Sequence, residues 1–97
     1  MEDLILYGTD AVTHPDIPLS VVDDARKILA MGCCIKFYHK QDTIGMPSVV
    51  IYNAAMDFAY KVIVLNPAEN FGKAKFDEFI RDYERFLKEH ARVAQIE

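Results

Sequence analysis

The feature that most constrains this chain is a helical spacing of large side chains between residues 73 and 91. They recur every three or four positions, and charged side chains fill the positions between them. The recurring set is Phe76, Phe79, Ile80, Tyr83, Phe86, Leu87 and His90. This spacing predicts an amphipathic helix about 28 Å long. Its apolar stripe, Phe76 to Leu87, must cover one side of a sheet, and the last residues, Ala91 to Glu97, are expected to fray.

An alternating pattern predicts the first of three strands, over residues 33–40. One face would carry Cys33, Ile35, Phe37 and His39, and the other would carry Cys34, Lys36, Tyr38 and Lys40. Such alternation of β-forming residues indicates a half-buried strand. The runs 48–53 and 58–65 predict two more strands, and the first of these hardly alternates, which suits a central position. Short connections, including a loop at 41–47, favour an antiparallel meander.

A second helix is predicted over residues 20–31. Ser20 would cap its start, and Gly32 would end it in the left-handed conformation. Residues 9–18 contain two prolines and are expected to form a loop, whereas the short apolar run 4–7 indicates a weak strand. The sequence therefore predicts a single α+β domain over residues 1–97. Its order would be (β)αβββα, with a three- or four-stranded, mainly antiparallel sheet and two helices on one face.

Charge and hydropathy exclude several classes of protein. The net charge is −4 and the two signs are mixed along the chain. Non-specific nucleic-acid binding requires clustered lysines and arginines, so there is no strong nucleic-acid signal. No apolar run approaches the roughly 18 residues of a membrane span, and the first residues lack the basic start of a signal peptide. Cys33 and Cys34 are adjacent and poorly placed to bridge each other. We expect reduced thiols and a cytoplasmic protein.

No constellation predicts catalysis, a metal or a cofactor. His14, His39 and His90 have no partner at a metal-ligand spacing. His39 and Asp42 could form a base and its orienting carboxylate, but no nucleophile is indicated beside them. Cys33 would follow a helix C-terminus, whose partial negative charge opposes thiolate formation. We therefore expect no cofactor and no metal, and an enzyme is the least favoured class.

A group of basic and aromatic residues forms the candidate binding site. The candidate residues are Lys36, Tyr38, Lys40, Lys61 and Lys73. The first four are expected to share the sheet face that the helices leave uncovered, and Lys73 stands at the start of the last helix. Tyrosine can stack on a ring and lysine can neutralise a phosphate, while lysine stems can also simply cover apolar surface.

The leading hypothesis is a non-enzymatic protein-interaction module, of an inhibitor or regulatory kind. We expect it to bind another protein or itself as a homodimer, because a short chain rich in Phe, Tyr and Met has more apolar surface than two helices can cover. Its size is also typical of accessory proteins of phages and mobile elements. The alternative is a small-ligand or nucleotide binder that uses the Lys/Tyr-lined face. The sequence leaves open which partner or ligand is bound, whether that face meets water or a second copy, and whether either thiol is reactive.

Overall fold

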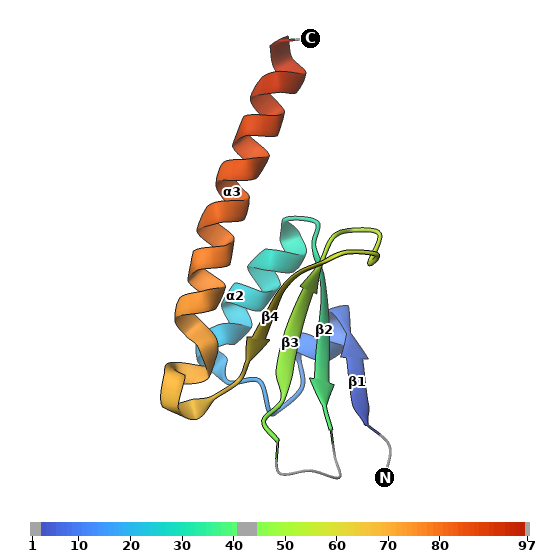
Figure 1. Cartoon of the computed structure of the whole chain (residues 1–97), viewed down its shortest axis with the longest axis vertical. Helices are drawn as coiled ribbons and strands as arrows, with labels where there is room; N and C mark the ends of the chain where they lie inside the picture. The colour runs from blue at the N-terminus through green and yellow to red at the C-terminus, as the bar shows by residue number, and fades with distance from the viewer. Residues whose placement is uncertain (1–2, 41–44, 97) are drawn as a thin grey trace.

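The computed structural model describes residues 3–40 and 45–96, and the side chains up to residue 90. Its elements are β1 (Leu4–Tyr7), α1 (Gly8–Val12), α2 (Leu19–Ala30), β2 (Cys34–His39), β3 (Ser48–Tyr52), β4 (Ala59–Val64), the 3-10 helix η1 (Pro67–Gly72) and α3 (Lys73–Ile96). The strands form one antiparallel sheet in the order β1-β2-β3-β4. The α+β fold with its four-stranded sheet is confirmed, and Figure 1 shows α2 behind that sheet. The expected loop at 41–47 and Asp42 fall wholly or partly on 41–44, outside the described residues.

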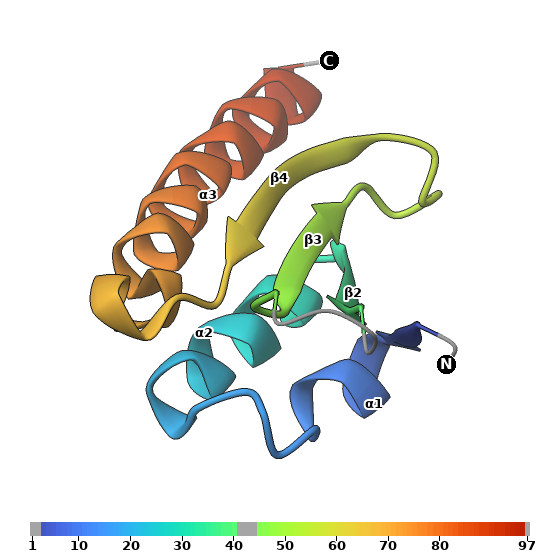
Figure 2. The ribbon, with the colours of Figure 1, turned by 60° about the horizontal axis from the view of Figure 1, so that its bottom comes forward.

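The two faces of the sheet differ because β-strand side chains alternate and the register aligns them. Phe37 of β2 is aligned with Leu6 of β1 and with Val49 of β3, which is aligned in turn with Ile63 of β4. Phe37, Val49 and Ile63 are fully buried beneath the helices. The helices therefore cover the face of Phe37, and the alternate residues form the other, uncovered face (Figure 2).

A short helix replaces part of the expected loop at 9–18. Gly8 takes a φ of +59°, which lets the chain turn directly from β1 into α1. Ala11 and Val12 on α1 are buried in the core. The prediction of a loop was wrong for residues 9–12, because the prolines that suggested it, Pro15 and Pro18, both lie after α1.

Helix α2 begins and ends for different reasons. Its cap is Pro18, whose carbonyl accepts hydrogen bonds from the amides of residues 21 and 22 at 3.0 and 3.2 Å. Ser20 lies within the first turn and makes no cap, so that prediction was wrong. At the other end Gly32 has a φ of +91° as predicted. Its amide donates to Leu29 and that of Cys33 donates to Ile28, the pair of bonds of a Schellman motif.

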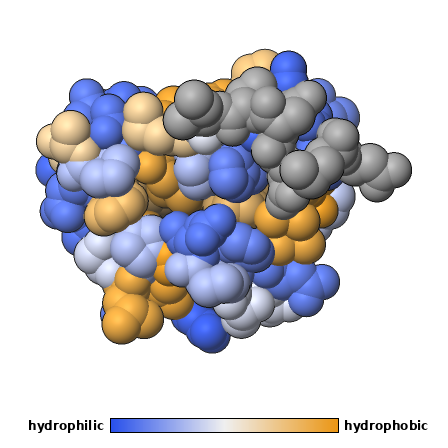
Figure 3. All heavy atoms as spheres, turned by 90° about the horizontal axis from the view of Figure 1, so that it is seen from below, coloured by the Kyte–Doolittle hydropathy of each residue, from blue (hydrophilic) through white to orange (hydrophobic). Residues whose placement is uncertain are grey.

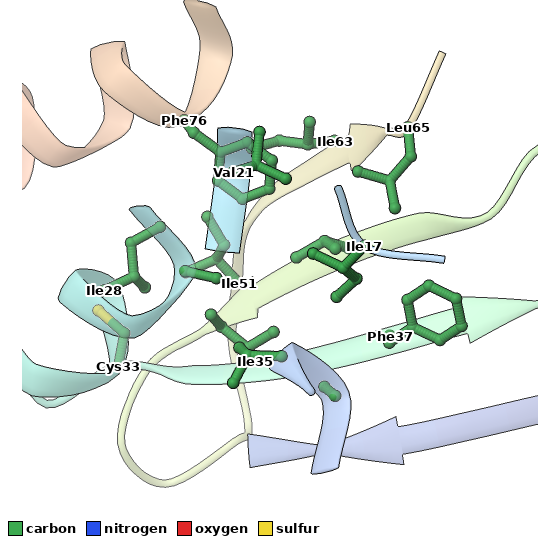
Figure 4. Packing of buried hydrophobic residues seen from close by; sticks show 14 of the residues in the cluster. Ile17, Val21, Ile28, Cys33, Ile35, Phe37, Ile51, Ile63, Leu65 and Phe76 are labelled. Carbon is green, nitrogen blue, oxygen red and sulfur yellow. The ribbon is translucent and has the colours of Figure 1, made fainter. Parts of the chain in front are cut away.

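One hydrophobic core joins the covered face of the sheet to all three helices. Figure 4 shows side chains from the strands and helices pointing into the same space. The buried members are Ala11, Val12, Ile17, Val21, Ala25, Ile28, Cys33, Ile35, Phe37, Val49, Ile51, Ile63, Leu65, Phe76 and Ile80. Phe76, which is completely buried, is the contribution of α3 to the centre of this core. The first half of the predicted stripe therefore packs on the sheet, as the sequence indicated.

The second half of the stripe extends beyond the sheet. Phe86 is 44% exposed and Leu87 is 37% exposed, and α3 continues as a helix to Ile96 rather than ending near residue 91. The molecule is 52 Å long and its radius of gyration is 14.5 Å, against about 12.5 Å for a compact domain of this length. The expectation that the whole stripe, Phe76 to Leu87, covers the sheet is corrected accordingly: only about two turns of α3 do so.

Candidate functional site

The uncovered face of the sheet carries apolar side chains at both edges. Ile5 and Tyr7 on β1 are 42% and 52% exposed, and Val62 and Val64 on β4 are 57% and 41% exposed. The register places all four on the same face as Lys36, since Tyr7 is aligned with Lys36 and Val62 with Val50, the residue opposite Lys36 on β3. The open face of an antiparallel sheet is usually polar. This one combines exposed apolar edges with a more enclosed centre.

The centre of this face is a lysine held between two tyrosine rings. The Nζ atom of Lys36 lies 6.0 Å from the ring centroid of Tyr38 and 5.6 Å from that of Tyr52. These are distances at which an ammonium group is attracted by an aromatic ring. The hydroxyl of Tyr38 donates to Asp3 Oδ2 at 2.9 Å. Val50, between the two tyrosines, is only 8% exposed. The centre of the face is therefore ordered by contacts within one chain.

The five residues predicted from the sequence do not form one cluster. Lys36 and Tyr38 lie together on the uncovered face. Lys40 comes two residues after Tyr38, and its side chain is exposed. Lys61 is aligned with Ile51, so it lies on the covered side of the sheet. The expectation that Lys61 shares the face of Lys36 is corrected by this register. A β-bulge next to Tyr52 in the pairing of β3 with β4 changes the alternation there.

Lys73 lies elsewhere again, between α2 and α3. Its Nζ atom is 2.6 Å from Asp24 Oδ2 and 3.1 Å from Asp77 Oδ1. The hydrogen bond to Asp24 raises the pKa of Lys73. Burial raises the pKa of Asp24, whereas hydrogen bonds with Asp24 and Lys73 lower that of Asp77. In this chain Lys73 therefore links α2 to α3. Binding of a partner or ligand by any of the five residues stays a prediction.

An aromatic groove that the sequence reasoning missed lies between β4 and α3. This α3–β4 groove has a volume of about 230 Å³ and is lined by Tyr60, Phe79, Asp82, Tyr83 and Phe86. Phe79 and Tyr83 stack with centroids 5.5 Å apart, and Tyr83 and Phe86 stack at 5.6 Å. Tyr60 faces them from β4 at 6.1 and 5.8 Å from Phe79 and Tyr83. The available signal was the continuation of the aromatic spacing beyond the turns that the core requires.

The floor of this groove contacts a buried thiol. The side chains of Tyr83 and Cys33 interact, and Cys33 is 4% exposed. Burial raises the pKa of Cys33, and burial together with this contact raises the pKa of Tyr83 to about 12. Both groups therefore stay protonated at neutral pH. Cys33 and Cys34 are both free cysteines, and their redox state stays a prediction.

The side chains of His14 and His39 both lie near the carboxylate of Asp16. The His14 ring stacks on buried Phe37 with centroids 4.7 Å apart, and its Nδ1 atom accepts from the Asp16 amide at 3.1 Å. The Asp16 carboxylate lies 3.9 Å from His39 Nδ1. Among residues 3–40 and 45–96, no three His, Cys, Asp or Glu side chains are placed to hold a metal ion.

Other surfaces are less distinctive. Seen from the end opposite the free end of α3, the molecule shows hydrophobic areas separated by hydrophilic ones (Figure 3). Within the described part of the chain, no helix has the length and apolar character that crossing a membrane requires.

Comparison of the chain with protein-family models, with curated proteins and with solved structures finds no match.

Proposed function

We propose that this chain is a non-enzymatic protein-interaction module that associates with a second copy of itself through the uncovered face of the sheet. The observation that carries the proposal is the set of exposed apolar side chains on that face: Ile5, Tyr7, Val62 and Val64. Removing such side chains from water is favourable in proportion to the apolar area buried. Two uncovered sheets can pack face to face with their side chains interdigitated.

The dimensions of the face set the strength of this association. Four strands of four to six residues at about 4.8 Å spacing give a flat area of at most about 19 by 20 Å. That is small beside the roughly 800 Å² per partner of a standard interface. We therefore expect a weak dimer, with a dissociation constant of about 10–100 µM. The two free cysteines agree with a reducing compartment such as the cytoplasm.

A second candidate function uses the centre of the same face. Lys36 lies between the rings of Tyr38 and Tyr52, and stacking rings beside a cation suit the base and phosphate of a nucleotide. The two candidates make opposite demands on Lys36. A nucleotide would need its charge, whereas a dimer would bring two copies of this charge into an interface whose interior normally lacks lysine.

The test is therefore a Lys36→Met variant, which keeps nearly the length of the side chain and removes its charge. Sedimentation equilibrium from about 10 to 500 µM should show tighter self-association for Lys36→Met than for the unchanged chain. In a thermal-shift assay with ATP, the second candidate predicts stabilisation of the unchanged chain, by about 2.7 kcal/mol at a hundred times the dissociation constant. Lys36→Met would abolish that stabilisation.

Two matched variants locate the interface. Val62→Glu places a charge on the uncovered face and should weaken self-association at least tenfold. Leu19→Glu places the same charge on α2, at a side chain that is 87% exposed, and should leave it unchanged. A chain that stays monomeric at about 500 µM, or equal effects of the two glutamates, would overturn the proposed dimer. A nucleotide-dependent thermal shift without self-association would support the second candidate instead.

A further inference from the structure

We propose that the α3–β4 groove binds an arginine side chain carried by a partner protein. The groove lies on the helix side of β4, away from the uncovered sheet face, so it is a second interaction surface. Its occupant is argued from the rings that form its walls, from its size and from its charge.

The walls are aromatic on both sides. Along α3, Phe79 and Tyr83 are nearly parallel, with 14° between their planes, and Phe86 extends this row at 27° to Tyr83. Tyr60 on β4 forms the opposite wall. The side chain of Tyr83 also interacts with that of buried Cys33, so this ring joins the groove to the core. A planar guanidinium group stacks on aromatic faces more favourably than a compact ammonium does.

The size of the groove suits one side chain. Its volume of about 230 Å³ lies below the range of about 300–1,000 Å³ that is typical of small-molecule sites. Phe86 at its outer end is 44% exposed, so the groove is accessible from solvent along the projecting part of α3. A segment of a partner could therefore insert a single long side chain there while the rest of it stays outside.

The charge selects a cation. Asp82 is the one charged side chain among the described residues that line the groove, and it is anionic. A carboxylate at the rim of an aromatic wall can accept hydrogen bonds from a guanidinium group whose plane rests on the rings. The chain as a whole carries a net charge of −4, which also favours the approach of a basic partner.

The test is a titration of the full ¹⁵N-labelled chain with the peptide acetyl-Gly-Arg-Gly-amide, followed by heteronuclear NMR. The control peptides carry citrulline, which has nearly the shape of arginine without its charge, or glutamate. We expect saturable shifts at the amides of residues 60, 79, 82, 83 and 86, with a dissociation constant of about 1 mM, as suits one cation–π contact and one ion pair. The citrulline and glutamate peptides should bind at least fivefold more weakly.

Matched variants separate this groove from the sheet face. Asp82→Asn should weaken arginine binding about fivefold or more, whereas Glu89→Gln, on the same helix but outside the groove, should not. Val62→Glu should leave arginine binding intact. Equal shifts with arginine and citrulline, shifts that map outside the groove, or unchanged binding by Asp82→Asn would overturn the inference. None of these results depends on whether the chain self-associates.

Discussion

Replacing Gly72 with alanine should destabilise the fold more than the same change at any other position with a similar backbone. Gly72 is buried at the junction of η1 and α3, with a φ of +75°. A Cβ atom added there would overlap Cγ2 of Ile63 and lie 3.3 Å from the carbonyl oxygen of Val64. Ile63 is completely buried, so its methyl group has no free space into which it can move.

The magnitude follows from two separable costs. A left-handed conformation costs a residue with a Cβ atom about 1–2 kcal/mol, and overpacking a filled core costs about 1–3 kcal/mol more. Gly72→Ala should therefore lower the free energy of unfolding by about 2–5 kcal/mol. Gly32 provides the matched control, because its φ is +91° but an added Cβ would meet nothing within 4 Å. Gly32→Ala should cost only the first part, about 1–2 kcal/mol.

Urea unfolding followed by circular dichroism measures both variants. With unchanged slopes, the shift in the midpoint of unfolding reports the loss of stability directly. The shift for Gly72→Ala should be about twice that for Gly32→Ala or more. Failure of Gly72→Ala to accumulate as folded protein, while Gly32→Ala folds, would agree with the same ordering. Equal midpoints for the two variants would refute the argument that the buried methyl group of Ile63 is in the way.

Three further predictions concern α3. Lys73→Met should lower the free energy of unfolding in urea by about 1–2 kcal/mol, because it leaves two carboxylates near each other without their shared cation. The control Lys27→Met breaks an exposed ion pair and should lower it by less than about 0.5 kcal/mol. Phe76→Ala should lower the free energy of unfolding by about 3–5 kcal/mol in the same assay, and Phe86→Ala should lower it by less than about 1 kcal/mol. Similar losses for the two variants would contradict the partial burial of α3. Because the pKa of Tyr83 is raised to about 12 in the folded chain, this hydroxyl ionises at a lower pH in the unfolded chain. Thermal unfolding should therefore show stability falling as the pH rises from about 10 towards 12. The Tyr83→Phe variant should show a smaller fall.

The sequence predicted those features that depend on local periodicity. Alternation in residues 33–40 placed Ile35 and Phe37 on the covered face, because a strand buried on one side must repeat every two residues. Gly32 was identified as the end of α2 since only a residue without a Cβ atom adopts its conformation at low cost. The helical spacing that begins at Phe76 likewise located α3 and its core contact.

The features that were missed depend mainly on contacts between residues far apart in the sequence. Lys61 is two residues from buried Ile63 and therefore shares its side of the sheet, but the sequence alone does not say which parity of this strand faces the helices. The pairing of Lys73 with Asp24 joins residues 49 positions apart. Helical spacing alone does not say where the surface under a helix ends, so the exposure of Phe86 could not be read from it. Five residues of α1 are too few for a period to be recognised.

The place of Phe76 at the centre of the core has a consequence for synthesis of the chain. Strands β2, β3 and β4 are neighbours both in sequence and in the sheet, so they can pair as soon as each one leaves the ribosome. Helices α1 and α2 leave the ribosome earlier and can cover part of the apolar face that these strands create, but the rest of that face stays open until the first turns of α3 arrive. A nascent chain that ends before residue 76 should therefore be a substrate for chaperones, and release from them should coincide with docking of this helix.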